Sequence, residues 1–260
     1  MRNFLKKVCL RIIKPVHIGD YIRGLYFKKI VKRFNFNIVL DAGCGTGKYI
    51  SYLVKKHPLI QINGYDINET NLQIARNLLQ ELNSGNANVC LNKQDLLELK
   101  ESNKYDLIYS IDVLEHIKGN RIVIRNFYNA LKKGGFLFIH MPSGNKKRLF
   151  NKRCFTNFDK LIKKEHVGEH YTLEELKYIC QDIGFRVRKT KYTFGFLGEL
   201  AWELDRITDT KYRLKMLLMP WLKILGRLDT ILPNRRGEPD IGSKIDFWED
   251  YTVVGGITCI

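Results

Sequence analysis

From Asn37 onward, short apolar runs rich in β-branched residues alternate with segments of helical periodicity. The runs that predict strands are 38–41, 60–66, 88–92, 106–111 and 136–141, and the segments that predict helices between them are 47–56, 69–82 and 121–132. Strands that alternate with helices are typical of a parallel sheet covered on both faces. The pattern therefore predicts a doubly wound α/β core.

One more helix and two more strands are predicted after this core. The helix, 172–182, follows a basic loop, has Thr172 as its cap and stops at Gly184. Strands are predicted at 185–192 and 251–260, and the roughly sixty residues between them far exceed an ordinary connection. We therefore expect an N-terminal amphipathic helical segment at 1–35, a core at 36–192, a helical insertion at 193–250 and a final core strand at 251–260.

The insertion carries large apolar residues that repeat every three or four positions. They predict one strongly apolar helical face, bent near Pro220, which consists of Leu214, Leu217, Leu218, Trp221, Leu222, Leu225 and Leu228. Basic residues accompany this face, and residues 2–14 form a second basic amphipathic pattern. Such a face closes over the active site or the core, or docks on a membrane surface, and both can hold. No run reaches the roughly 18 apolar residues of a membrane span.

The charge of the chain is strongly positive, with 44 Lys and Arg against 27 Asp and Glu and a formal net charge of +17. This excess predicts attraction to polyanions, which include nucleic acid, anionic lipid headgroups and acidic substrates. The six cysteines include no CxxC pair, so neither a zinc module nor a disulfide framework is expected. These features fit a cytoplasmic protein that docks peripherally on the inner face of the membrane.

A glycine-rich loop follows the first predicted strand, in the segment VLDAGCGTGKY. The strand runs into Asp41 and then into Gly43, Gly45 and Gly47. Because glycine has no side chain, the backbone can turn sharply here and approach a ligand closely. The loop therefore predicts a nucleotide-like ligand.

The spacing of this loop excludes two common nucleotide-binding patterns. A P-loop is excluded by Ala42 and Tyr49, and a strict dinucleotide fingerprint by Lys48. DAGCGTG instead resembles the loop of class I S-adenosylmethionine (SAM)-dependent methyltransferases, an acidic residue followed by GxGxG. YDLIYSIDVLEHI and ALKKGGFLFIHMP are likewise similar to the fourth and fifth strand regions of the small-molecule members, the quinone and lipid methyltransferases.

The resemblance extends over about residues 37–142 and implies a fold and a cofactor. The implied fold is a seven-stranded, mostly parallel, Rossmann-like sheet with an antiparallel last strand and, in this chain, a helical insertion before that strand. The implied cofactor is SAM. The residues expected to bind it are Asp41, Gly43, Gly45, Gly47, Asp66, Ile67, Asp95, Leu96 and Ser110.

Two of these residues, Asp66 and Asp95, are expected to contact particular groups of the adenosine. Asp66 ends the second strand, where its carboxylate can accept hydrogen bonds from both ribose hydroxyls, and the neighbouring Ile67 can pack on adenine. Asp95 matches a family residue that accepts a bond from the adenine amino group, with Leu96 as an apolar wall. Taken alone, Asp95 is more often a turn-forming surface residue.

Candidate proton acceptors follow the fourth strand. Asp112, Glu115 and His116 have i, i+3 and i+4 spacing, which predicts one shared helical face beside the loop. In quinone O-methyltransferases the matching residues are Glu, Glu and His and bind a divalent cation. The alternative is that this segment caps and packs the loop, which the shorter Asp112 favours. We expect Asp112 and His116 to act in catalysis and no metal ion to be bound.

A second group of candidates, His166 and His170, precedes the helix that Thr172 caps. This position often faces the acceptor in such enzymes, so both are predicted to act as bases or acceptor contacts. Gly168 between them argues against a helical zinc pair.

Together these features predict a SAM-dependent methyltransferase with a small or lipid-linked acceptor and an anionic membrane surface as a further partner. A nucleic-acid methyltransferase is the alternative explanation of the charge, although no NPPY-type motif or zinc ribbon is present in the sequence. A nucleotide-binding scaffold without catalysis is the second alternative.

Overall fold

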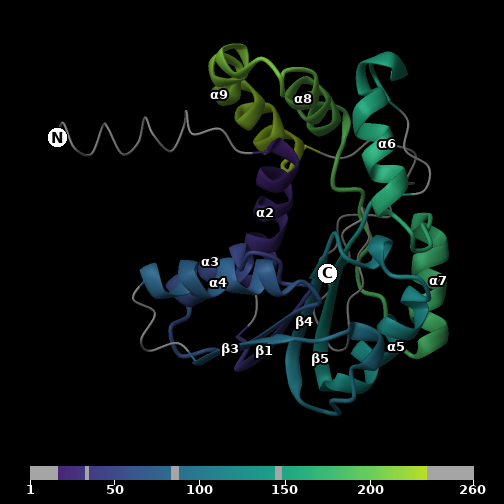
Figure 1. The fold of residues 1–260 in the computed structure, drawn as a ribbon. Coiled ribbons are helices and arrows are strands. Elements are labelled where there is room, and N and C mark those ends of the chain that lie inside the picture. The colour runs from purple at the N-terminus through teal and green to yellow at the C-terminus, as the bar shows by residue number, and fades with distance from the viewer. Residues whose placement is uncertain (1–16, 33–34, 83–87, 144–147, 233–260) are drawn as a thin grey trace. The chain divides into compact units, whose positions relative to one another are not determined.

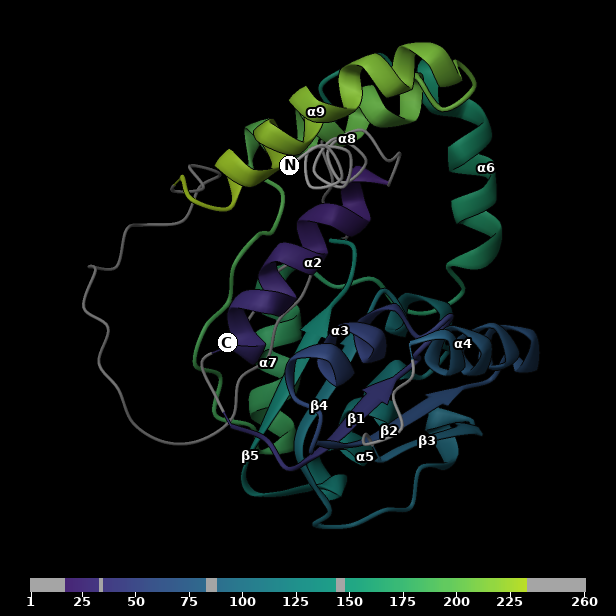
Figure 2. The same cartoon turned by 90° about the vertical axis from the view of Figure 1, so that its left-hand side faces the viewer.

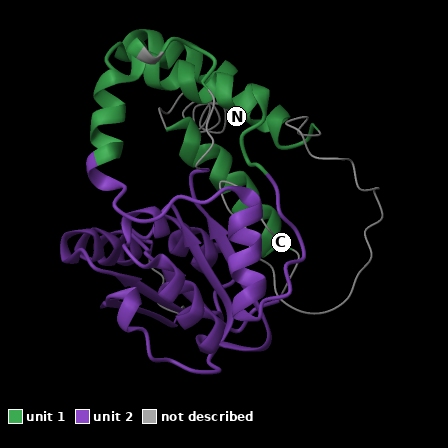
Figure 3. Cartoon of the chain, turned by 90° about the vertical axis from the view of Figure 1, so that its right-hand side faces the viewer, with its two compact units in different colours: residues 1–33, 146–163, 192–244 green, residues 34–145, 164–191, 245–260 purple. Residues whose placement is uncertain are grey.

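The computed structural model describes residues 17–32, 35–82, 88–143 and 148–232, with Lys152 by its backbone only. The chain divides into two compact units (Figure 3). The described parts of the helical unit are 17–32, 148–163 and 192–232, and those of the sheet unit are 35–82, 88–143 and 164–191.

The sheet unit contains five described strands: β1 (Ile38–Ala42), β2 (Gln61–Asp66), β3 (Asn88–Lys93), β4 (Tyr105–Ile111) and β5 (Leu131–His140). Their order is β3-β2-β1-β4-β5, and every neighbouring pair is parallel (Figure 1). The chain moves outward from β1 to β3 and then returns to place β4 on the other side of β1. This reversal creates a topological switch point between β1 and β4, where the carboxyl ends of open α/β sheets bind ligands.

Helices cover both faces of this sheet, as the alternating pattern predicted. On one face lie α3 (Lys48–Lys56) and α4 (Glu69–Glu81), and on the other α5 (Asn120–Ala130) and α7 (Leu173–Ile183) (Figure 1). The central strands are buried between the two helical layers, and Leu40, Ile108 and Tyr109 are fully inaccessible. The near-continuous apolar character of β1 and β4 follows from burial on both sides.

The predicted cap of α7 is confirmed. Thr172 accepts a hydrogen bond from the Glu175 backbone N–H (3.3 Å), and the Glu175 carboxylate accepts one from the Thr172 N–H (2.7 Å). Gly184 ends the helix in the left-handed conformation, with φ of 119°. Local sequence therefore determines both ends of this helix.

Three local predictions need correction. β5 begins at Leu131, five residues early, because its start forms an irregular pairing around Gly134, which has φ of 81°. The predicted strand at 185–192 does not form: Phe185 is buried against the Tyr128 ring of α5 instead (centroids 5.0 Å apart). The basic loop contains a helix, α6 (Thr156–Glu165).

The described residues thus contain a five-stranded sheet rather than the seven strands that the family resemblance implied. The last expected strand, 251–260, lies outside the described residues, as do the amphipathic segment 2–14 and residues 233–250 of the insertion. The parallel, doubly wound core itself is confirmed.

The helical unit consists of α2 (Ile18–Val31), η3 (Lys152–Phe155), most of α6, α8 (Phe196–Ile207) and α9 (Tyr212–Asp229). Helices α8 and α9 lie side by side (Figure 2). Residues from α2, α8 and α9 share one core, formed by Ile18, Ile22, Tyr26, Ala201, Met219 and Leu222. Among the described helices, none is long and apolar enough to cross a bilayer.

Candidate functional site

The glycine loop lies at the switch point, between the end of β1 and the start of α3. Gly43, Gly45 and Gly47 all have positive φ (86°, 50° and 76°), which side chains other than glycine rarely adopt. A Cβ at Gly43 would lie 2.3 Å from Val113 Cγ2, so the loop also packs tightly against the segment after β4. Sequence and packing therefore both require glycine at this position.

Asp66, at the end of β2, faces this loop. Its Oδ2 accepts a hydrogen bond from the Gly45 N–H (2.7 Å), and its Oδ1 accepts one from the Asn68 N–H (2.8 Å). The neighbouring Ile67 is 65% exposed, so its apolar side chain is accessible beside the loop. A carboxylate beside an open glycine loop and an exposed apolar side chain fit the ribose and base of an adenosine.

Asp41 is held differently, because it is buried beneath the loop. Its carboxyl is 2% exposed and accepts a hydrogen bond from the Tyr109 hydroxyl (2.8 Å). Burial raises the pKa of Asp41 to about 8, although the bond from Tyr109 opposes this shift. Tyr109 faces Asp41 across the β1–β4 pair and is a site residue that the sequence did not identify.

Asp41→Asn is expected to stabilise the ligand-free protein at alkaline pH. The folded-state pKa of about 8 lies above the unfolded value of 3.8, so the contribution of Asp41 to stability is present below pH 3.8 and is lost as pH rises toward 8. The variant should remove this loss and raise the free energy of unfolding at pH 8 by about 1 kcal/mol or more. Urea unfolding at pH 5 and pH 8 measures the difference.

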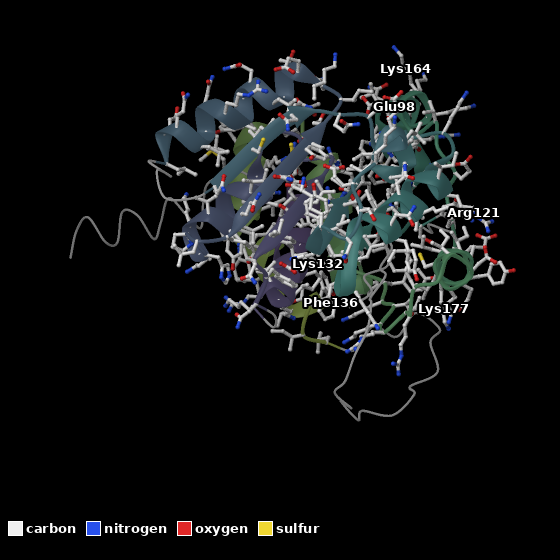
Figure 4. The ribbon with its side chains drawn as sticks, turned by 90° about the horizontal axis from the view of Figure 1, so that it is seen from below. Glu98, Arg121, Lys132, Phe136, Lys164 and Lys177 are labelled. Atoms are coloured by element: carbon white, nitrogen blue, oxygen red, sulfur yellow. The ribbon has the colours of Figure 1, made fainter. Side chains whose placement is uncertain are left out.

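Asp106→Asn is the matched variant, and it is expected to change the free energy of unfolding in the opposite direction. The Asp106 carboxylate accepts hydrogen bonds from the backbone N–H groups of Asn37 and Ile38 (3.0 and 2.7 Å) and pairs with Lys132 (2.8 Å), which is labelled in Figure 4. Loss of this charge should lower stability at both pH values. A decrease for both variants at pH 8 would contradict the burial argument for Asp41.

The remaining expected cofactor residues lie at neighbouring strand ends. Asp95 accepts a hydrogen bond from the Leu97 N–H (2.9 Å) and so caps the 3-10 turn η1 (Leu96–Glu98). Leu96 is 4% exposed, and Ser110 in β4 is fully buried. Asp95 thus has a local structural role, whatever it contacts in a complex.

Asp112 does not share a helical face with Glu115 and His116. The helical turn there, η2, spans only Leu114–His116, and Asp112 precedes it with φ of 55°. Its backbone N–H donates to the His140 carbonyl (2.8 Å), and its Oδ1 lies 2.7 Å from His140 Nδ1. The i, i+3, i+4 prediction is therefore wrong, because β5 holds Asp112 out of the helix.

His140 is the second site residue that the sequence did not identify. It ends β5, lies opposite Ile111 in the β4–β5 pair, and is 3% exposed. The sequence does place this histidine at the carboxyl end of a predicted strand, where open α/β sheets bind ligands, so it could have been identified as a candidate. A positive φ at a residue other than glycine destabilises the fold, and such residues are concentrated at functional sites. The conformation of Asp112 and its contact with His140 therefore make this pair a candidate for catalysis.

His116 and His166, fifty residues apart, come together in the sheet unit. Buried Asn120 joins their segments, because its amide donates to the carbonyls of Leu114 and Glu169 (3.0 Å each). The imidazole rings of His116 and His166 have centroids 4.8 Å apart, and His170 stacks on His166 at 5.1 Å. Three of the four expected catalytic residues therefore form one cluster.

This histidine cluster also contains metal-binding chemistry. Ligand atoms of Glu115, His116 and His166 all lie within 4.8 Å of one another, so these residues can hold a divalent cation. Burial and the nearby imidazoles of His116 and His170 lower the pKa of His166 to about 4, which keeps its ring neutral at physiological pH. A neutral imidazole can accept a proton or bind a metal.

Known proteins that this chain is similar to are methyltransferases. The family model of the methyltransferase domain matches residues 17–190. The chain is 29% identical over 134 residues to ubiquinone biosynthesis O-methyltransferase of Coxiella burnetii, a match that covers 51% of this chain and 55% of the relative. It is 29% identical over 173 residues to malonyl acyl-carrier-protein O-methyltransferase of Priestia megaterium, covering 64% of this chain and 61% of the relative. The chain thus spans little more than half the length of these curated relatives.

A solved structure with a similar fold is Haemonchus contortus phosphoethanolamine N-methyltransferase 2 in complex with SAM. It has a TM-score of 0.56 and 21% sequence identity, and the match covers 78% of this chain and 49% of that one. At this identity the similarity shows the fold alone.

Proposed function

The chain belongs to the methyltransferase domain family, and on that premise we propose that it transfers the methyl group of SAM to a small or lipid-linked acceptor. The observation that carries the proposal is Asp66, whose carboxylate lies against the glycine loop at the switch point. The open loop and the exposed Ile67 complete a surface suited to adenosine. These residues fit the cofactor that the family uses.

The residues assigned to SAM lie at several strand ends, and each binds a different part of the cofactor. Asp66 binds the ribose hydroxyls, Ile67 packs on adenine, and the glycine loop approaches the methionine part together with Asp41. Asp95 and Leu96, which follow β3, shape the adenine end of the site, and Ser110 supports the cofactor site from β4 on the other side of β1. When bound, SAM supplies a sulfonium-activated methyl group, so the protein mainly has to align the acceptor and accept a proton.

We propose that Asp112, positioned by His140, accepts the proton that the acceptor loses. The acceptor oxygen or nitrogen forms a bond to the methyl carbon while the sulfur–carbon bond breaks and its electron pair stays on sulfur. The proton of the acceptor passes to the Asp112 carboxylate. A hydrogen bond from His140 Nδ1–H, at the observed 2.7 Å, orients that carboxylate and stabilises its charge.

The histidine cluster is the second candidate for this step. The neutral ring of His166 favours a role as proton acceptor, with His116 and His170 beside it. Glu115, His116 and His166 also fit a divalent cation, which would lower the pKa of a phenolic acceptor. Activity measured with chelator and after addition of Mg²⁺ or Zn²⁺ separates a metal role from a base role.

The acceptor is proposed from the relatives and from charge. The two curated relatives are named for ubiquinone biosynthesis and for a malonyl group on acyl-carrier protein. The net charge of +17 favours an anionic surface nearby. These two features support our proposal of a lipid-linked acceptor and of an enzyme that acts at the cytoplasmic face of a membrane.

Calorimetric titration with SAM and with NAD tests the cofactor assignment, and binding of NAD alone would refute it. Transfer of tritiated methyl from SAM to a polyprenyl phenol, to malonyl acyl-carrier protein and to bulk RNA then tests the acceptor. Label in the polyprenyl phenol is the expected result. Label in RNA alone would favour the nucleic-acid alternative, and SAM binding without any transfer would favour a scaffold.

A further inference from the structure

Helix α9 and the residue pair that follows it expose a continuous row of large apolar side chains, here called the α9 stripe. Its members and their exposed fractions are Leu214 (42%), Leu217 (74%), Trp221 (66%), Ile224 (50%), Leu228 (43%) and Ile231 (67%). They alternate at spacings of three and four, so they lie within an arc of about 100° along a helix of 3.6 residues per turn. At a rise of about 1.5 Å per residue the stripe is about 26 Å long.

The α9 stripe is separate from the face of α9 that packs in the core. Met219 and Leu222 are buried against α2 and α8, and Leu218 and Leu225 are partly buried beside them. The apolar face predicted from sequence is therefore divided: Leu218, Leu222 and Leu225 pack toward the core, and its other members lie in the exposed stripe. Among residues 17–32, 148–163 and 192–232, core packing uses only the first, and the second is an extended exposed apolar patch of the kind that marks an interaction site.

The flank of the α9 stripe carries exposed arginines, while three acidic side chains of α8 and α9 point inward. Glu203, Asp205 and Asp229 are at most 6% exposed, and they accept hydrogen bonds from backbone N–H groups within the unit. Arg213 and Arg227, by contrast, are exposed on α9. The stripe thus combines large apolar side chains with neighbouring positive charge.

From this juxtaposition we propose that the α9 stripe docks on an anionic lipid bilayer, with α9 lying in the plane of the interface. The apolar side chains enter the acyl boundary, Trp221 lies at headgroup depth, and Arg213 and Arg227 contact lipid phosphates. A second copy of the chain fits less well, because a two-fold contact would bring these arginines toward like charges. Nucleic acid would use the charge but would leave the apolar side chains in water.

This inference rests on the proposed function only for its purpose, which is to bring the enzyme to a lipid-linked acceptor. The docking itself needs neither SAM nor acceptor. Both properties can therefore be measured separately on the same samples.

The test is sedimentation of the full chain with phosphatidylcholine vesicles, with and without phosphatidylglycerol. Wild type should bind the anionic vesicles and bind the neutral ones more weakly. Leu217→Glu with Trp221→Glu should reduce the affinity at least about tenfold, and Arg213→Ala with Arg227→Ala about tenfold at low salt. The matched control is Leu59→Glu, because Leu59 is 92% exposed in the sheet unit and should leave binding unchanged.

Trp221 provides a direct readout of depth. Brominated lipid should quench wild-type fluorescence more than that of Trp221→Phe, which keeps the apolar stripe. Failure of wild type to bind anionic vesicles, or wild-type affinity of the Leu217→Glu and Trp221→Glu variant, would overturn the proposal. So would light scattering that shows this variant converting a dimer to a monomer without affecting vesicle binding.

Calorimetry with SAM on every sample separates the two proposals. Normal SAM binding without vesicle binding would refute the docking and the membrane location, and would leave the assignment of SAM as methyl donor intact. Vesicle binding without SAM binding would refute the proposed function and leave the docking intact.

Discussion

Asp66→Ala is expected to weaken SAM binding by about 3 to 6 kcal/mol, a loss of about 10²- to 10⁴-fold in affinity. The carboxylate would accept two hydrogen bonds from ribose hydroxyls, and each bond to a charged group contributes about 1.5–3 kcal/mol. In the ligand-free protein the same carboxylate bonds the N–H groups of Gly45 and Asn68, so it is already oriented at the loop. Calorimetric titration measures the change.

The matched control for this variant is Glu69→Ala. Glu69 is a neighbouring carboxylate in the first turn of α4 and pairs with Arg76 on the surface (2.6 Å). It should bind SAM as wild type does, because a pair at the surface contributes little. Thermal unfolding without ligand shows whether either variant is misfolded. Equal SAM affinity of a folded Asp66→Ala and wild type would remove Asp66 from the site.

Asp112→Asn is expected to lower kcat by about 100-fold or more, because general base catalysis contributes about 10²–10⁴-fold. Asparagine tolerates the left-handed conformation that residue 112 adopts, with φ of 55°. The variant therefore removes the charge and keeps the backbone. SAM affinity should change little, and kcat with the acceptor identified by the methyl-transfer assay is the measurement.

His140 tests whether Asp112 acts through a partner. His140→Leu should lower kcat about tenfold, while His140→Asn, which retains a donor near the position of Nδ1, should recover much of it. A purely structural role of His140 would instead affect stability in both variants without the difference in kcat. Asp182→Asn serves as the control, because Asp182 pairs with Arg121 on the surface.

His166→Asn discriminates between the two candidate proton acceptors. If it lowers kcat as strongly as expected for Asp112→Asn, while Asp112→Asn retains wild-type kcat, the histidine cluster performs the step and the role assigned to Asp112 is wrong. The reverse result supports Asp112 and leaves His166 as a contact of the acceptor.

Much of the sheet unit was predictable because its signals are local. The strands of the doubly wound core, the cap of α7 and the glycine loop each depend on residues close in sequence. Two of the errors share one cause, which is the influence of distant partners. Phe185 packs on Tyr128 instead of extending a strand, and pairing with β4 begins β5 before the residues that look like a strand.

By itself, therefore, the sequence determined the order of strands and helices from β1 to β5, the positions that must be glycine and the carboxylate at the end of β2. Only the tertiary structure joined Asp112 to His140, Asp41 to Tyr109, and His116 to His166. It also decided which apolar residues of α9 are buried and which form the exposed stripe. The physical reason is that helix and turn preferences act within a few residues, whereas hydrogen bonds and burial depend on segments that folding brings together.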